Sequence, residues 1–245
     1  MTAWNSAVVG PLTVVREGAS DDAARDLAAG VDLLQTVRAG GAGPTLRIYR
    51  PAPTLAFGQR DTRLSGYDDA ARLAADAGFT PLVRRAGGRA AAYHRGTLIV
   101  DHVEPDPEAV LGHQGRFRAL GELYARALGT LGVDAHVGEI EGEYCPGEFS
   151  VHGNPGVYSR AARPVKLVGT AQRVVAGAWL FASVFVVQDS GPLRAVLTDV
   201  YDALDLPFDP ATAGAVDDLV PGATVADVED ALLTAYAEHV EVATA

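Results

Sequence analysis

The chain contains a single cysteine, Cys145, in the sequence EYCPGEFS at residues 143–150. A thiol can hold an acyl group as a thioester, which stays reactive toward an amine. Carboxylates disfavour a thiolate, so a raised thiol pKa is predicted from four nearby glutamates, Glu139, Glu141, Glu143 and Glu148. A lone cysteine is otherwise a small buried apolar residue. The residues alone leave both interpretations open.

Lys166 is the one lysine among 20 basic residues and begins the sequence KLVGTAQR. A lysine at the start of an apolar strand, followed by small residues, places an ammonium beside a narrow pocket. It could neutralise a carboxyl, phosphate or carbonyl oxygen there. The alternative is an edge-strand lysine that prevents aggregation.

The basic residues gather in two windows that contain no acid. Residues 79–100 hold Arg84, Arg85, Arg89 and Arg95, and residues 149–188 hold Arg160, Arg163, Lys166 and Arg173. These windows predict either two solvated strand edges or a cationic cleft for a phosphate, a carboxyl or an acidic protein.

The first window also contains Gly87 and Gly88 between arginines, where backbone N–H groups could approach an anion closely. The pattern is neither G-x-G-x-x-G nor a Walker A sequence, which excludes the Rossmann and P-loop interpretations. His94, in the same run, is by itself more typical of a structural histidine.

The elements that must position these residues follow from hydrophobic spacing. Helices are predicted over residues 21–38, with Ser20 as N-cap, and over residues 68–77, 107–131, 192–204 and 225–240. Strands are predicted over residues 45–50, 54–57, 81–84 and 98–103, with a strand pair inside 166–187. The pattern indicates an α+β fold. We predict a catalytic core over residues 1–190 and a helical segment over residues 191–245 packed on it.

Composition excludes several classes of protein. The 245 residues are 48% hydrophobic and carry a net charge of −11, which argues against an ordinary basic nucleic-acid binder. The most apolar stretch, residues 174–187, is shorter than the about 20 residues that a membrane helix needs. Residues 1–9 lack the basic start of a signal peptide. We therefore expect a cytoplasmic protein that binds neither nucleic acid nor membrane.

Taken together, these segments resemble the lipoate–protein ligase and octanoyltransferase superfamily, whose catalytic fold is shared with biotin protein ligase. The resemblance covers most of the chain. It begins at residues 46–49 and at PTLAFGQ (53–59), continues through the Arg/Gly-Gly/His run, and is strongest at KLVGTAQR. It implies mixed and antiparallel sheets with helices. The cysteine loop is most similar to the cysteine-dependent octanoyltransferase type.

The resemblance also implies roles for individual residues. Cys145 would carry the acyl thioester and Lys166 would contact the acyl carbonyl. The substrate-binding residues would be Arg84, Gly87, Gly88, Arg89, Tyr93, His94, Gly169, Thr170 and Ala171. The run between Gly88 and His94 is one residue longer than usual, so either Tyr93 or His94 takes the position of the family histidine. His94 and His152 are the candidate bases for the thiol, and no metal site is expected.

The implied activity is transfer of an octanoyl or lipoyl group to a lysine of a lipoyl domain through a thioester on Cys145. The donor would be acyl carrier protein or an octanoylated glycine cleavage H protein. The acceptor would be the H protein or the E2 subunit of a 2-oxoacid dehydrogenase. This cycle needs no cofactor.

Two alternatives remain open. One is an ATP-dependent lipoate–protein ligase, in which Lys166 and the Arg/Gly-Gly loop hold lipoyl-adenylate with Mg²⁺. The other is a non-catalytic relative that binds lipoyl or acyl groups. Biotin ligation is disfavoured because the residues follow the lipoate branch.

Overall fold

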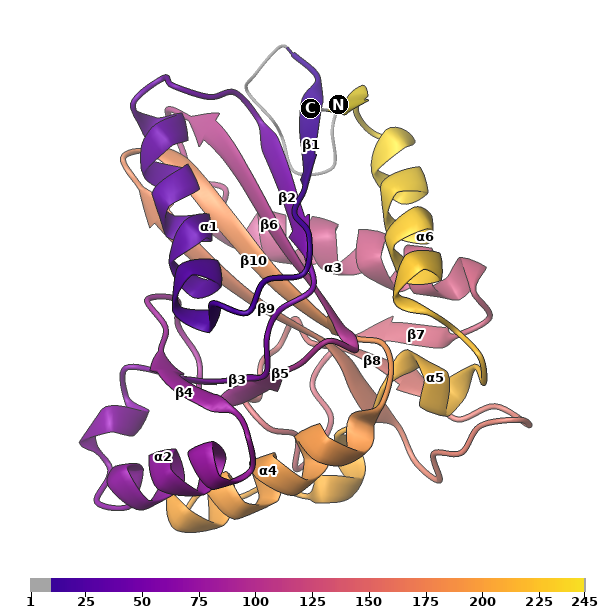
Figure 1. Ribbon diagram of the computed structural model, residues 1–245. Coiled ribbons are helices and arrows are strands. Elements are labelled where there is room, and N and C mark those ends of the chain that lie inside the picture. Colours follow the sequence, from indigo (N-terminus) through magenta and orange to yellow (C-terminus); the bar gives the residue numbers. More distant parts are fainter. Residues whose placement is uncertain (1–9, 245) are drawn as a thin grey trace.

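The computed structural model describes residues 10–244, so the expectation about a signal peptide concerns residues outside the described range. One large mixed sheet has the strand order β11-β1-β2-β6-β10-β9-β8-β7 (Figure 1). Pairing is parallel at β11–β1 and β1–β2 and antiparallel at the remaining contacts of this sheet. Its strands are β1 (Leu12–Arg16), β2 (Thr45–Tyr49), β6 (Thr97–Asp106), β7 (Asp134–Val137), β8 (Val151–Asn154), β9 (Val165–Val175), β10 (Gly177–Val186) and β11 (Val242–Thr244).

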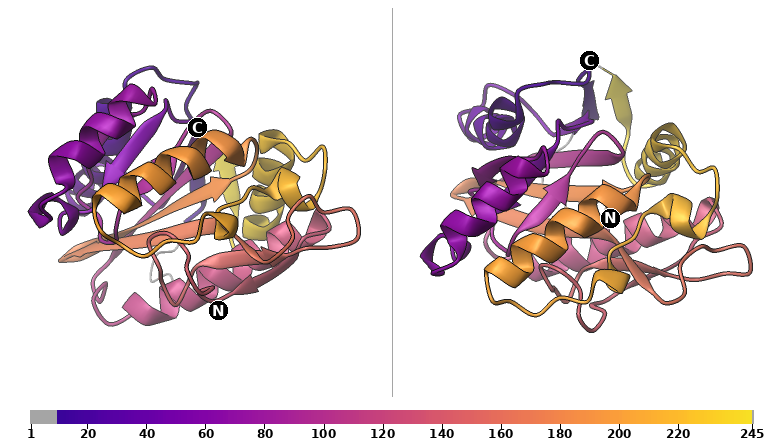
Figure 2. Two further views of the ribbon diagram at one scale, coloured as in Figure 1. Left: turned by 90° about the horizontal axis from the view of Figure 1, so that it is seen from below. Right: turned by 60° about the horizontal axis from the view of Figure 1, so that its bottom comes forward.

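A second, three-stranded sheet lies below the first in Figure 1 and has the order β4-β3-β5. It consists of β3 (Thr54–Phe57), β4 (Thr80–Val83) and β5 (Ala91–Tyr93). Two helices pack against each other beneath it, α2 (Tyr67–Asp76) and α4 (Ser190–Ala203), as the two views of Figure 2 also show. The remaining helices are α1 (Ala23–Arg38), α3 (His113–Thr130), α5 (Val216–Leu219) and α6 (Val225–Ala237).

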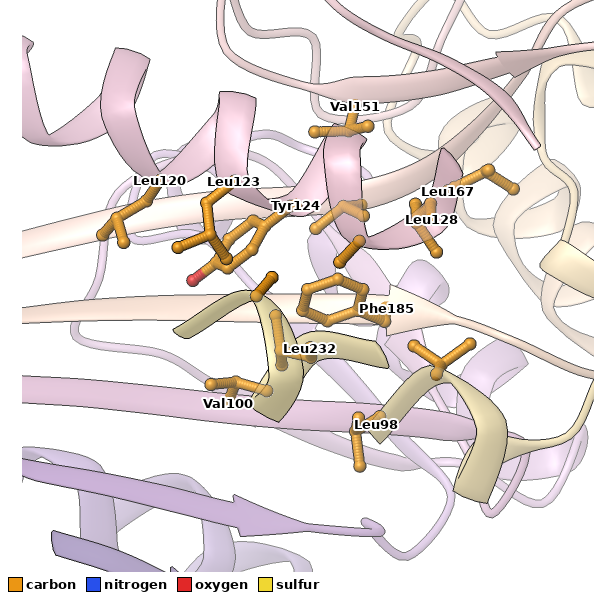
Figure 3. Packing of buried hydrophobic residues seen from close by; sticks show 14 of the residues in the cluster. Leu98, Val100, Leu120, Leu123, Tyr124, Leu128, Val151, Leu167, Phe185 and Leu232 are labelled. Carbon is orange, nitrogen blue, oxygen red and sulfur yellow. The ribbon is translucent and has the colours of Figure 1, made fainter. Parts of the chain in front are cut away.

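The main core lies between the large sheet and the helices α3 and α6. Figure 3 shows Tyr124 and Leu128 of α3 and Leu232 of α6 directed toward strand residues such as Val100 and Phe185. These side chains are buried, and removing apolar surface from water is the main stabilising contribution. This packing makes the three long central strands β6, β10 and β9 a rigid platform.

Helix α1 covers the opposite face of the same strands (Figure 1). Its Leu34 and Val37 are buried against Val103 and Leu180 of the sheet. The cavity described below lies on this face, where small side chains on β9 and β10 leave space beside α1.

The α+β fold class is confirmed, and every helix and strand predicted from periodicity is present, most with ends shifted by a few residues. Two predicted boundaries were wrong. The side chain of Asp22, not Ser20, caps α1 by accepting from the N–H of Arg25. The helix predicted from residue 107 begins at His113, because the carboxylate of Asp106 accepts from the N–H of Glu108 and turns the chain.

The C-terminal part of the chain is integrated with the rest. α4 contributes to the same buried cluster as β3 and β5, α6 contributes to the main core, and β11 pairs with β1. The division at residue 190 stays a prediction. Within residues 10–244, no helix combines the length and the apolar character needed to cross a bilayer.

Candidate active site

Cys145 lies in the loop between β7 and β8 and has a left-handed backbone conformation, with φ of 43°. A residue other than glycine is strained there unless its surroundings hold it. The N–H of Cys145 donates to the hydroxyl of Tyr201 in α4 over 2.6 Å, and that hydroxyl donates to the carbonyl of Ala90 over 3.0 Å. Tyr201 therefore joins the cysteine loop to the chain segment just before β5.

The sulfur of Cys145 lies within hydrogen-bond distance of two donors from the Arg/Gly-Gly segment. The N–H of Arg89 lies 3.2 Å from Sγ, and Nη2 of Arg84 lies 3.4 Å from it. Arg84 is buried, and its Nη1 donates to the hydroxyl of Tyr93 over 3.3 Å. These donors favour a thiolate over a thiol.

Lys166 is 1% exposed and holds the cysteine loop from the other side. Its Nζ donates to Oε1 of Glu143 at 3.0 Å, to the carbonyl of Tyr144 at 3.0 Å and to the carbonyl of Cys145 at 2.8 Å. An ammonium has three protons to donate, so all three have acceptors in the loop. Since β9 lies between β8 and β10, Lys166 is not an edge-strand lysine.

The carboxylate of Glu143 is fully buried and organises the rest of this loop. It accepts from the hydroxyl of Ser150 over 2.6 Å and from the N–H groups of Gly147 and Ile140 over 3.2 and 3.3 Å. The Glu143–Lys166 ion pair is thus supported by further hydrogen bonds, as a buried ion pair requires.

The predicted rise in the pKa of Cys145 was wrong. Burial raises the pKa of this thiol, but the charges of Arg84 and Lys166 and the hydrogen bonds from Arg89 and Arg84 lower it, and the net shift is downward from 9.0. The error came from judging charges by sequence distance, because the nearest glutamate, Glu143, is paired with Lys166.

A cavity of about 370 Å³ opens beside the thiol. Cys145, Lys166 and the glycines at positions 87 and 88 lie along it at one side. Its walls are largely apolar and come from α1, β2, β5, β6, β9 and β10, through Leu27, Gly30, Val31, Tyr49, Ala91, Ala92, Tyr93, Ile99, Ala171, Leu180, Ala182 and Val184. A largely apolar cavity with a few polar groups is typical of a small-molecule or acyl site.

The structure brings most of the predicted site residues together. The cavity is lined by Cys145, Lys166, Arg84, Gly87, Gly88, Tyr93, Gly169, Thr170 and Ala171. Arg89 contributes its backbone N–H to the sulfur, while its side chain pairs with Asp61 over 3.0 Å.

The two candidate histidines lie elsewhere. Nδ1 of His94 accepts from the N–H of Gly96 over 2.9 Å, and its Nε2 donates to the carbonyl of Asp189 over 2.8 Å. His152 donates from Nδ1 to the carbonyl of Gly138 over 2.9 Å. Neither lines the cavity, whereas Tyr93 does.

Most charges of the two acid-free windows are paired in space with acids from other segments. Arg89, Arg95, Arg160 and Arg163 pair with Asp61, Asp21, Asp217 and Asp209. Arg85 and Arg173 form no ion pair among residues 10–244, and Nη1 of Arg173 donates to the carbonyl of Arg85 over 3.1 Å. Arg85 lines the cavity, so positive charge remains beside it.

Tyr201 and Asp101 were missed by sequence reasoning. Tyr201 lies 56 residues from Cys145, in a helix whose pattern indicates only an apolar face. Asp101 is an acid within a buried strand, in the sequence LIVDHV, and that signal could have identified it. In the part of the chain that the structure describes, no group of three or more His, Cys, Asp or Glu could hold a metal ion.

Comparison of sequences finds relatives that are named as octanoyltransferases or lipoyltransferases. The chain is 29% identical over 178 residues to the octanoyl-[GcvH]:protein N-octanoyltransferase of Geobacillus kaustophilus, which covers 72% of this chain and 59% of that protein. It is 26% identical over 130 residues to the lipoyl-[GcvH]:protein N-lipoyltransferase of Listeria monocytogenes, which covers 53% of this chain and 47% of that protein. The matched part thus spans less than two thirds of these relatives.

Comparison of structures supports the fold. A putative lipoate protein ligase of Thermoplasma acidophilum with bound lipoic acid superposes with a TM-score of 0.71 at 19% identity, covering 96% of this chain and 89% of that one. A lipoate-protein ligase A bound with ATP superposes with a TM-score of 0.70 at 21% identity, covering 97% and 88%.

The family model described as the lipoyl protein ligase A/B catalytic domain matches residues 22–237, which contain all the residues of the cavity and the cysteine loop. The resemblance read from the sequence motifs is therefore confirmed, and the chain belongs to the lipoyl protein ligase A/B catalytic domain family.

Proposed function

We propose that this protein is an acyltransferase that moves an octanoyl group between lipoyl domains through a thioester on Cys145. The observation that carries the proposal is the placement of a thiol of lowered pKa at one side of an apolar cavity, beside Arg84 and Lys166. An ATP-dependent ligase needs no such thiol, because its activated intermediate is an acyl-adenylate. The names of the relatives, which specify transfer from one protein to another, support the same activity.

The reaction would proceed in two steps. The thiolate of Cys145 attacks the carbonyl carbon of the octanoyl amide on the donor lysine, the S–C bond forms, the C–N bond breaks, and the amine leaves with a proton. The amine of the acceptor lysine then attacks the thioester, a C–N bond forms, the C–S bond breaks, and the thiolate returns as the amine loses a proton. Protons balance over the cycle, and neither metal nor nucleotide enters it.

Lys166 would contribute its positive charge to both steps. Its charge lowers the pKa of the thiol and favours the negative charge that develops on the carbonyl oxygen. To donate directly to that oxygen, Nζ would exchange one of its three present acceptors, the carbonyls of Tyr144 and Cys145 or the carboxylate of Glu143.

The donor in this proposal is an octanoylated glycine cleavage H protein, since the names of several relatives specify GcvH. Arg85 and Arg173 beside the cavity would attract an acidic lipoyl domain. Acyl carrier protein is the other donor to test, and the acceptor is a lipoyl domain of the H protein or of an E2 subunit.

The test is transfer between purified proteins without ATP. Octanoylated H protein and an unmodified E2 lipoyl domain are incubated with the enzyme, and the mass of the acceptor is followed. We expect acceptor octanoylation that requires the enzyme and is lost in Cys145→Ala. Transfer that survives Cys145→Ala and requires ATP with free octanoic or lipoic acid would instead establish a ligase. If neither condition gives transfer while lipoic acid still binds, the protein is a binding relative.

A further inference from the structure

The end of the cavity away from the cysteine loop carries a buried charge. Asp101 of β6 lines the cavity and is 5% exposed, and its Oδ2 accepts from Nη1 of Arg47 over 2.9 Å. Arg47 is 2% exposed and also donates from Nε and Nη2 to Glu17, over 2.9 and 2.7 Å. A buried carboxylate in the wall of a largely apolar acyl cavity needs an explanation, because burying charge is costly.

We propose that Asp101 sets the length limit of the acyl chain, so that a chain of about eight carbons fills the cavity and longer chains are excluded by the Asp101–Arg47 ion pair. The inference rests on the proposed function, whose acyl group would occupy this cavity.

The register of the sheet gives the distance available. Ala171 of β9 pairs with Ala182 of β10, and Ala182 pairs with Asp101 of β6. Small side chains thus form the floor from β9 to Asp101, over two strand spacings that together amount to about 10 Å. Lys166 lies before Ala171 on β9, and its Cε lies 3.8 Å from the position of a Cβ on Gly169, so its ammonium end is displaced along the strand from this row by about two residues, or about 7 Å. Since Nζ of Lys166 donates to the carbonyl of Cys145, the cysteine loop lies at that end, and Asp101 lies about 12 Å from it across and along the sheet. A staggered chain of eight carbons with bonds of about 1.5 Å is about 9 Å long and fits within this distance.

Helix α1 covers the end of the cavity at Asp101. A Cβ on Gly30 would lie 2.6 Å from Oδ2 of Asp101, so the helix backbone is already close to the carboxylate. Beyond Asp101, the next residue in the row is Arg47 of β2, which pairs with Asp101 across the sheet. A longer chain therefore meets charged groups and helix backbone instead of further apolar space.

This arrangement predicts a sharp dependence on chain length. Each methylene that enters apolar surroundings strengthens binding by about fourfold. That gain should continue up to octanoic acid and stop or reverse at decanoic and dodecanoic acids, because the added methylenes would have to displace the carboxylate of Asp101 or remain in water.

The test compares binding of hexanoic, octanoic, decanoic and dodecanoic acids to the enzyme by calorimetry. In Asp101→Ala the limit is removed while Arg47 keeps its two hydrogen bonds to Glu17. We expect the wild type to prefer octanoic over dodecanoic acid by at least tenfold, and Asp101→Ala to reduce this ratio to about one or invert it. The matched control is Glu17→Ala, which removes the other acidic partner of Arg47 from outside the cavity and should keep the wild-type ratio.

Ala182→Leu tests the same limit without touching the ion pair. The larger side chain occupies the floor beside Asp101 and should move the preference from octanoic to hexanoic acid. An unchanged length preference in both Asp101→Ala and Ala182→Leu, or an equal change in Glu17→Ala, would overturn the inference. Should Asp101→Ala fail to fold, Asp101→Asn, which keeps the shape of the side chain and removes its charge, takes its place in the comparison with Glu17→Ala.

The binding data separate this inference from the proposed function. If Asp101→Ala changes the chain-length preference but the protein transfers no octanoyl group, the transferase is refuted and the length limit is retained. If the protein transfers an octanoyl group and its chain-length preference is the same in the wild type and in Asp101→Ala, the transferase is supported and the length limit is refuted.

Discussion

The hydroxyl of Tyr201 accepts a hydrogen bond from the backbone N–H of Cys145 over 2.6 Å, and so helix α4 fixes the backbone of the candidate nucleophile. The contact explains how Cys145 keeps a left-handed conformation that other residues rarely adopt. The same hydroxyl donates to the carbonyl of Ala90, which precedes the cavity-lining residues of β5. Tyr201 is therefore a positioning residue for both sides of the site.

Replacing Tyr201 by Phe should slow acylation of Cys145 by about tenfold, the effect of losing about 1.4 kcal/mol of transition-state stabilisation. The N–H of Cys145 and the carbonyl of Ala90 lose their partner, which also costs about 1–3 kcal/mol of stability. Burst-phase acylation and thermal unfolding measure the two effects. Tyr124→Phe, which removes a buried hydroxyl of the main core, is the control and should destabilise without slowing acylation. Equal acylation rates for both variants would refute the positioning role.

The two adjacent glycines of the Arg/Gly-Gly segment should respond differently to alanine. A Cβ on Gly88 would lie 2.5 Å from Nη2 of Arg84 and 2.7 Å from Sγ of Cys145, and the φ of Gly88 is +101°. A Cβ on Gly87 would have no other atom within 4 Å, and the φ of Gly87 lies outside the left-handed region. We expect Gly88→Ala to abolish acylation and Gly87→Ala to retain most of it, measured as acyl-enzyme formed per minute. Equal activity of the two variants would show that Gly88 does not pack against the thiol.

Lys166 should have a structural and a catalytic contribution that can be separated. Lys166→Met leaves the buried carboxylate of Glu143 without its charge partner and should cost about 3–5 kcal/mol of stability. The double variant Lys166→Met/Glu143→Gln removes both charges and should recover part of that stability in denaturant unfolding. Its acylation should stay slow, because the thiol has lost a positive neighbour. A double variant with wild-type acylation would assign Lys166 to structure alone.

The pKa of Cys145 should be visible in its alkylation by iodoacetamide. Arg84 and Lys166 lower this pKa against the effect of burial, so thiolate persists to lower pH than for an ordinary cysteine. The midpoint of the rate–pH profile should lie below 9.0, the ordinary value from which this pKa is lowered. In Arg84→Gln the midpoint should move upward, because a positive charge and a hydrogen bond are lost. A wild-type midpoint at or above 9.0 would contradict the electrostatic account.

Much of the fold could be predicted because its long elements carry strong local patterns. The apolar spacing of α1 and α6, and the β-branched and aromatic residues of β9 and β10, specify these elements without tertiary information. The short strands β5, β7 and β8 were not predicted, although β3 and β4, which are also short, were. They are stabilised by pairing with neighbouring strands, which the local sequence does not encode.

The site was predicted where single residue types stand out and missed where tertiary contacts decide. Cys145 and Lys166 are each the only residue of their type, which drew attention to both. The pKa of the thiol depends on Arg84, which is 61 positions away in sequence and 3.4 Å away in space. Tyr201 and Cys145 are also distant in sequence and in contact in the fold. So are Lys166 and Glu143, whose pairing neutralises the carboxylate nearest to Cys145 in sequence.

The central claim is that Cys145 carries the acyl group, and the intact mass of the protein tests it most directly. The enzyme is incubated without ATP with octanoylated H protein and, separately, with octanoyl acyl carrier protein. The account predicts a gain of one octanoyl group that hydroxylamine removes and that is absent in Cys145→Ser. An unchanged mass with both donors, together with acyl transfer that appears only after ATP and free acid are added, would contradict it.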